Sequence, residues 1–100
     1  MEKMSGIIRV TPVELEGMSL RYSNESAQVE EQIIRLDGMI DELQGMWEGE
    51  SSRAFADQYV SLRPSFVDMS RLLQEVSTQL KNTAQALADA DRQIASQIRG

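Results

Sequence analysis

The chain has 100 residues, enough for one domain, and 41% of them are hydrophobic, which argues against a disordered chain. It contains no cysteine and no histidine, which excludes disulfides and removes the commonest metal ligands, nucleophiles and general bases. The formal net charge of −6 disfavours nucleic acid and anionic membrane surfaces as partners, because both are bound mainly through lysine and arginine.

The scarcity of helix breakers favours an all-helical protein. There are two prolines and six glycines, and only 5% of the residues are aromatic, whereas sheets need aromatic and β-branched residues and frequent turns. The first ten residues, "MEKMSGIIRV", contain no apolar core long enough for a signal peptide, and no stretch approaches a membrane span. We therefore expect a protein without cofactors that is made in the cytoplasm. Any export would use a route that does not read a cleaved signal.

A first helix is expected over residues 12–47, after an N-terminal arm of residues 1–11. Thr11 is placed to cap the backbone N–H of Glu14, whose side chain can reach back to Thr11, and Pro12 occupies the first helical position. From Leu15 to Trp47 the apolar residues recur at steps of three and four, with Ser26 as a polar gap. This spacing predicts a seam along which the helix packs lengthwise on another.

Residues 48–50 form the expected turn, because Gly49 can adopt a backbone conformation that other residues resist. A second helix is expected over residues 51–96, followed by a tail of residues 97–100. Its seam runs from Phe55 to Ile94 at alternating steps of four and three. Pro64 lies within this run without shifting its register, which predicts a bend and not an end. So short a connection predicts an antiparallel hairpin.

The apolar face of each helix is wider than a two-helix contact needs, and a lone hairpin has little core. The sequence therefore predicts a homodimer in which two antiparallel hairpins form a four-helix bundle, although a heterodimer with a similar hairpin remains open. The residues expected to form the hairpin and dimer core are Leu15, Tyr22, Val29, Ile33, Leu36, Ile40, Leu43, Phe55, Tyr59, Leu62, Phe66, Met69, Leu73, Val76 and Leu80.

Four methionines, at positions 18, 39, 46 and 69, lie on or beside the seam. Their spacing favours a role as gap-fillers in the core, with an adaptable partner-binding strip as the alternative. Trp47 has two similar interpretations. It can plug the end of the hairpin, or it can serve as an exposed anchor for a partner.

The central "WEG" at residues 47–49, between two heptad seams in a chain of this length, resembles the Trp-X-Gly (WXG) family of early-secreted-antigen-like proteins. "SSRAFADQY" after the turn is also similar to that family. The start "IIRVTPVELEGM" and the ending "IASQIRG" resemble the EsxA/YukE type of Gram-positive bacteria. The resemblance implies export as a folded dimer by the type VII (ESX-like) secretion system. It also implies recognition by a hexamer-forming membrane ATPase of the FtsK/SpoIIIE type.

Many members of that family carry a Y-x-x-x-D/E export signal after the second helix, but this chain has no tyrosine after Tyr59. A looser form of the pattern is matched by four residues whose spacing puts them on one helical face. The alternative is that they are seam residues and a solvated charge. In an antiparallel dimer of hairpins, the turn of one chain lies near the far ends of the other chain's helices. We therefore expect a composite export signal, made by Trp47 and Gly49 of one chain and the end of the second helix of the other. The four residues that match the looser export pattern at the end of the second helix are Leu87, Asp91, Ile94 and Ile98.

Three other functions are alternatives to this interpretation of the sequence. The paired carboxylates at positions 37 and 41, and at 89 and 91, are those an acid–base enzyme could use, but they fall between seam positions and are expected to be solvated. We therefore expect no enzymatic activity. A membrane-active effector would need acidic pH to neutralise its carboxylates. A carrier for other secreted proteins cannot be separated from a cargo by sequence.

Overall fold

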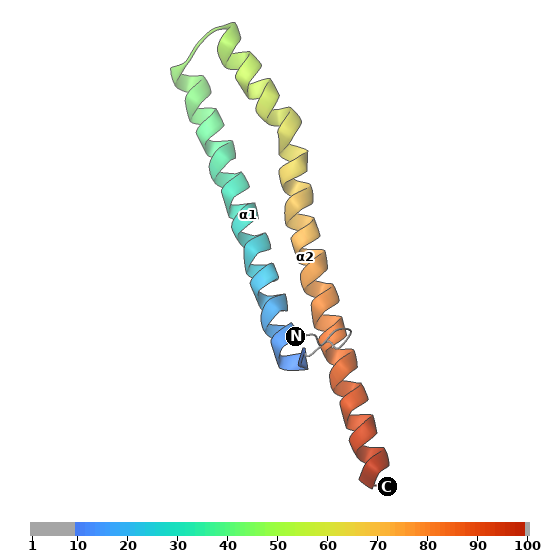
Figure 1. Ribbon diagram of the computed structural model, residues 1–100. Coiled ribbons are helices and arrows are strands. Elements are labelled where there is room, and N and C mark those ends of the chain that lie inside the picture. Colours follow the sequence, from blue (N-terminus) through green and yellow to red (C-terminus); the bar gives the residue numbers. More distant parts are fainter. Residues whose placement is uncertain (1–9, 100) are drawn as a thin grey trace, which may run out of the picture.

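The computed structural model describes residues 10–99, which form the predicted all-helical hairpin (Figure 1). Helix α1 comprises Pro12–Met46 and helix α2 comprises Glu50–Arg99. The two helices run antiparallel and side by side, and the molecule measures 76 × 28 × 16 Å. So thin a body has no interior of its own beyond the contact between the two helices.

The start of α1 is fixed by the predicted capping box. The backbone N–H of Glu14 donates to Thr11 Oγ1 at 3.1 Å, and the backbone N–H of Thr11 donates to Glu14 Oε1 at 2.9 Å. Pro12 occupies the first turn, where its missing N–H leaves no bond unmade. Residues 1–9 of the expected N-terminal arm lie outside the described residues.

The reversal between the helices is built on Trp47 and Gly49. The helix ends at Met46, and Trp47 follows in extended conformation while its N–H donates to the carbonyl of Leu43 at 2.9 Å. Gly49 has a φ of +115°, a region that strongly favours glycine. Helix α2 begins directly after it, at Glu50, where the helix dipole favours an acid.

The far end of α2 differs from the expectation. The helix continues to Arg99, so residues 97–99 of the expected tail are helical, and only Gly100 lies outside the described residues. The physical reason is that "ASQIR" contains no residue that breaks a helix before that glycine. Pro64 lies inside α2 without ending it, and the ribbon of α2 changes direction in its first third (Figure 1).

The contact between α1 and α2 is lined mainly by small side chains. Ser19 Oγ donates to the carbonyl of Ser77 at 2.8 Å, and Ser77 Oγ donates back to the carbonyl of Ser19 at 2.7 Å. Ser26 and Ser70 repeat this reciprocal arrangement one heptad closer to the turn. All four serines are buried, and their size lets the two backbones approach closely. Ile33 is the only large apolar side chain of the described residues that is buried.

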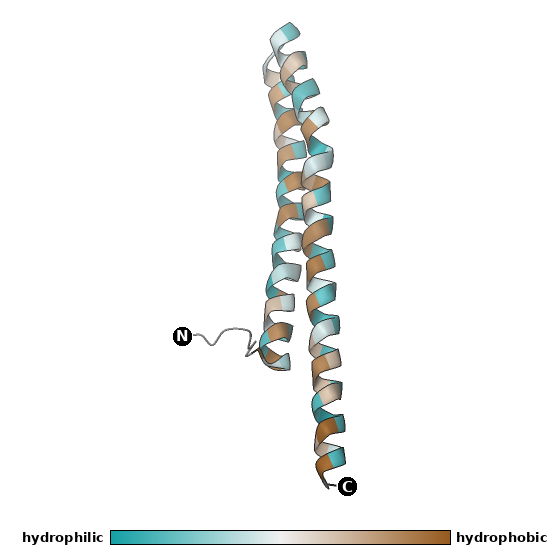
Figure 2. Cartoon of the chain, turned by 45° about the vertical axis from the view of Figure 1, so that its right-hand side comes forward, coloured by the Kyte–Doolittle hydropathy of each residue, from teal (hydrophilic) through white to brown (hydrophobic). Residues whose placement is uncertain are grey.

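The serine pairs set the register of the hairpin. Ser26 lies opposite Ser70, and Ser19, seven residues earlier in α1, lies opposite Ser77, seven residues later in α2. One more step of seven residues in the same direction places Pro12 opposite Ala84. Residues 85–99 of α2 therefore have no α1 residue beside them and extend past it by about 22 Å. Figures 1 and 2 show this extension, with apolar residues continuing to the end of α2.

Most of the predicted core lies beside the serine contact instead of in it. These residues gather on one side of the hairpin, which we call the apolar face, where Leu36 and Phe66 are half-buried and Leu62 and Met69 are exposed in the single chain. The polar gap expected at Ser26 is thus part of a serine contact between the helices. The large apolar residues beside the serine contact therefore form an exposed surface. An apolar surface of this kind is typical of a site that binds another protein chain.

Candidate functional site

The turn presents an aromatic pair to solvent. The rings of Trp47 and Phe55 lie 6.1 Å apart with their planes tilted by 45°, within the range of favourable aromatic pairs. Trp47 remains 40% exposed. Gly49 and Ser52 help to line a shallow hollow of about 420 Å³ beside the indole. The tryptophan therefore packs on the hairpin and remains accessible to a partner.

A larger groove opens next to the turn on the apolar face. Its volume is about 600 Å³, and nearly all of its surface is apolar. Met39 and Met46, which belong to the methionine set, lie on its wall and are exposed. The groove is lined by Leu36, Met39, Ile40, Glu42, Leu43, Met46, Phe55, Gln58, Tyr59 and Leu62.

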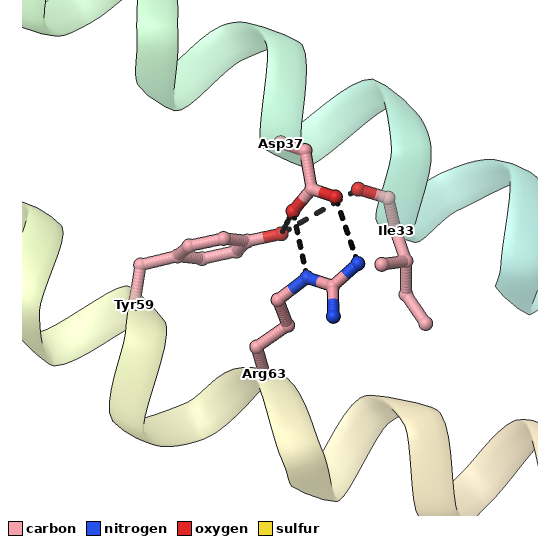
Figure 3. A network of polar contacts seen from close by, with 4 residues as sticks. All are labelled: Ile33, Asp37, Tyr59 and Arg63. Atoms are coloured by element: carbon pink, nitrogen blue, oxygen red, sulfur yellow. Dashed lines mark hydrogen bonds and ion pairs between the residues drawn. The ribbon is translucent and has the colours of Figure 1, made fainter.

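A polar clamp ties α1 to α2 (Figure 3). The guanidinium of Arg63 donates to both oxygens of Asp37 at 2.9 Å, and Tyr59 Oη donates to Asp37 Oδ1 at 2.6 Å and reaches the carbonyl of Ile33 at 3.5 Å. The hydrogen bond from Arg63 is the main cause that lowers the pKa of Asp37, with the hydrogen bond from Tyr59 second. The carboxylate of Asp37 in turn raises the pKa of Tyr59 and of Arg63.

The clamp corrects one sequence interpretation, and the serine contact adds one feature that the sequence interpretation missed. Asp37 was expected to be a solvated charge paired with Asp41, but it is bound by Arg63 across the helix contact. Sequence reasoning also missed the serine pairs as contact residues. Both contacts can be recognised only when the two helices are aligned residue by residue. In that alignment Asp37 lies opposite Tyr59, just as Ser26 lies opposite Ser70.

The four residues of the expected signal near the C-terminus lie on the part of α2 that has no α1 beside it, and all four are exposed. Ile98 is 80% exposed. Within the single chain, they and Trp47 lie at opposite ends: about 40 helical residues separate Glu50 from Asp91, which corresponds to about 60 Å. The structure therefore brings Trp47 together with Phe55, but not with the C-terminal residues of its own chain.

Two kinds of site are not found in the described part of the chain. Residues 10–99 contain no cluster of three or more carboxylates arranged to hold a metal ion. In the same range, neither helix has a stretch apolar enough to cross a membrane.

Residues 7–92 match the family model WXG100, described as "Proteins of 100 residues with WXG". The chain belongs to the WXG100 family. Among solved structures, this WXG100 chain is similar to EsxA of Geobacillus thermodenitrificans, with a TM-score of 0.85 and 57% identity over 91% of this chain and all of that one. The secreted protein EsxB of Bacillus anthracis gives a TM-score of 0.77 and 29% identity, over 89% of this chain and 99% of that one.

Two WXG100 relatives span nearly the whole chain. Protein YukE of Bacillus subtilis is 56% identical over 97 residues, which cover 97% of this chain and all of YukE. Type VII secretion system extracellular protein A of Staphylococcus aureus is 29% identical over 90 residues, which cover 90% of this chain and 93% of that protein. The resemblance predicted from the "WEG" turn is confirmed by these matches.

Proposed function

We propose that this chain is a non-enzymatic protein exported by a type VII secretion system as a folded homodimer. The observation that carries the proposal is the match, over nine-tenths of the chain, to a relative named as an extracellular protein of that system. The protein would then be made in the cytoplasm and act outside the cell.

The apolar face supports the dimer. In the single chain, aromatic and aliphatic residues of both helices are left half-buried or exposed on that face, while the close contact between α1 and α2 uses serine and alanine. A second copy related by a two-fold axis would present the same face and so provide a cover of matching shape. A four-helix bundle with crossing angles near 20° is the usual result for long antiparallel hairpins.

The composite export signal follows from the shape of such a dimer. Trp47 and Asp91 are too far apart in one chain for one receptor pocket to contact both. In an antiparallel dimer, however, the turn of one copy lies near the C-terminal end of α2 of the other. Trp47 and Gly49 of one chain, with Leu87, Asp91, Ile94 and Ile98 of its partner, would then form one surface. Its proposed receptor is a membrane ATPase of the FtsK/SpoIIIE type.

The first test uses two variants of the full dimer. Trp47→Ala removes the aromatic anchor, and a chain that ends before Leu87 removes the far half of the signal while keeping every residue that has α1 beside it. Both are expected to remain folded dimers, with the shortened chain losing only the mass and helix of the removed residues, but to stay in the cell, as judged by immunoblots of cells and medium. Normal secretion of both variants contradicts the composite signal.

A mixed dimer tests whether the two halves come from different chains. Co-expressed Trp47→Ala chains and shortened chains can pair, and each mixed dimer contains one intact Trp47 beside one intact C-terminal end. Secretion of both chains is expected to recover when they are expressed together. If each chain is retained even in the mixed dimer, the two halves act within one chain and the proposed geometry is wrong.

A further inference from the structure

A second apolar stripe runs along α1 on the side away from the apolar face. Val13, Leu20, Ala27 and Ile34 follow one another at intervals of exactly seven residues, and all four are exposed. We call these four residues the back-face stripe. Leu20 is 67% exposed and Ile34 is 68% exposed. Heptad spacing is the pattern of a helix that packs lengthwise on another, yet α2 does not cover these residues.

The back-face stripe cannot be part of the dimer contact that the apolar face provides. At 3.6 residues per turn, Ile34 and Leu36 point in directions about 160° apart. The grooves agree with this: Leu36 lines the groove on the apolar face, whereas Ala27 and Ile34 line a separate groove of about 640 Å³ on the opposite side. An antiparallel dimer therefore leaves the back-face stripe free.

The second groove adds apolar residues from α2. Val67 lines it together with Ala27 and Ile34, and Val60 lies exposed one heptad before Val67. Ser26 and Ser70 also line it, at the serine contact between the helices. Two arginines also line the groove and both are paired: Arg63 with Asp37 of α1, and Arg71 with Asp68 of its own helix. A groove of this form between two helices accepts a third helix.

Two glycines extend the back-face stripe toward the turn. Gly38 and Gly45 fall on the same side of α1, and a Cβ built on either meets no atom within 4 Å. A glycine inside a helix costs free energy compared with alanine, and nothing in the hairpin requires one at these positions. Close approach by a backbone from outside the hairpin would account for both.

The charges beside the stripe indicate what kind of helix would bind. Helix α1 carries eight carboxylates and two arginines, whereas α2 carries six of each sign. Five exposed carboxylates and a single exposed arginine, Arg35, lie three or four residues from members of the stripe or from Gly38, which places them along its two borders. In a helical contact these border positions select the charge of the partner. The five are Glu16, Glu30, Glu31, Asp41 and Glu42.

We propose that the back-face stripe docks one amphipathic helix of a partner protein, with aliphatic residues at heptad spacing and lysine or arginine beside them. An anionic membrane is disfavoured as the occupant, because the bordering carboxylates would repel it. The inference goes beyond the proposed function, since it uses a face that the dimer leaves free. Purified protein tests it without any secretion assay, so failure of one proposal leaves the other standing.

The experiment measures binding of a labelled synthetic peptide to the full-length protein by fluorescence anisotropy. The peptide has about four heptads, with leucine at the two seam positions and lysine at the bordering positions; a control peptide carries glutamate there. The lysine peptide is expected to bind at least tenfold more tightly than the glutamate peptide. No binding by the lysine peptide, or equal binding by both, overturns the proposal.

Variants locate the site. Leu20→Gln with Ile34→Gln is expected to weaken binding of the lysine peptide at least tenfold, whereas Leu72→Gln, at an exposed leucine outside the stripe, leaves it unchanged. Gly38→Ala is expected to weaken binding while raising the melting temperature, a pair of opposite effects that loss of folding cannot produce. An equal loss of peptide binding in Leu72→Gln overturns the proposal. Conversion of the dimer to single chains by the double variant also overturns it, because the stripe would then be a surface for self-association.

Discussion

The serine contact between α1 and α2 and the apolar face beside it differ in their roles. At the contact itself, Ser19, Ser26, Ser70 and Ser77 are buried and exchange hydrogen bonds, so they fix how α1 and α2 align. On the apolar face beside it, the large side chains remain partly exposed, although burial of such groups provides most of the stabilisation in a fold. The difference indicates that small polar residues shape the single chain and that large apolar residues are kept for a partner.

The largest expected effect is on the apolar face. Leu62→Glu places a charge where the dimer would bury it without a partner, at a cost of about 3–5 kcal/mol, which weakens association by a thousandfold or so. Leu20→Glu is the matched control, since Leu20 is also an exposed leucine, at 67% against 48% for Leu62, but belongs to the back-face stripe on the other side of the hairpin. Size-exclusion chromatography with light scattering is expected to detect single chains only for the first variant. The same dimer mass for both would remove the distinction between the faces.

The next effect concerns the serine contact. Ser26→Leu forces extra carbons between two closely packed backbones and is expected to destabilise the hairpin by about 1–3 kcal/mol. Ser26→Ala adds no bulk and removes the hydrogen bond that the Ser26 hydroxyl donates to the carbonyl of Ser70, at about 0.5–1.5 kcal/mol. Urea unfolding followed by circular dichroism compares the two. If the leucine variant is the more stable, the helices do not need small residues where they meet.

A smaller effect is expected at the turn. Gly49→Ala forces a residue with a Cβ into a positive φ and is expected to cost about 1–2 kcal/mol. Gly45→Ala, inside α1 with open space around it, is instead expected to stabilise the helix by about 0.5–1 kcal/mol. Thermal unfolding reports both. Equal shifts in the same direction would mean that the turn does not depend on the glycine conformation.

The smallest effect is expected at the clamp, which is partly open to solvent. Folding lowers the pKa of Asp37, so its contribution is fully present above the ordinary value of 3.8 and is lost as the pH falls through the lower folded-state pKa. Asp37→Asn should therefore lower stability at neutral pH and make the loss of stability in acid less steep. Asp68→Asn, which breaks a pair within α2, is the control. Melting curves at several pH values that superimpose for Asp37→Asn and the parent would contradict this role.

The sequence was most informative where the signal is local. The capping box at Thr11, the turn at Gly49 and the heptad steps each depend on residues close together along the chain, and they predict two helices and their reversal. What the heptad pattern could not predict is which side of each seam meets the other helix, because that choice depends on the alignment of two segments. The serines and the Asp37 clamp could therefore be recognised only after residues 26 and 70 were known to face each other.

The sequence also could not show what lies beside Leu87, Asp91, Ile94 and Ile98, near the end of α2. Their spacing predicts one apolar face with Asp91 on it, and the structure extends that helix to Arg99. In the described part of the chain no residue of α1 lies beside them, so the proposed role of these residues in export needs a second copy.

The most direct test of the account is the mass of the purified protein in solution, measured by sedimentation equilibrium over a range of concentrations. A homodimer has a mass of twice 11.3 kDa, and its helical content is expected to fall when dilution separates the chains, because the apolar face then loses its cover. A mass of 11.3 kDa at every concentration, with full helical content and cooperative unfolding, would contradict it.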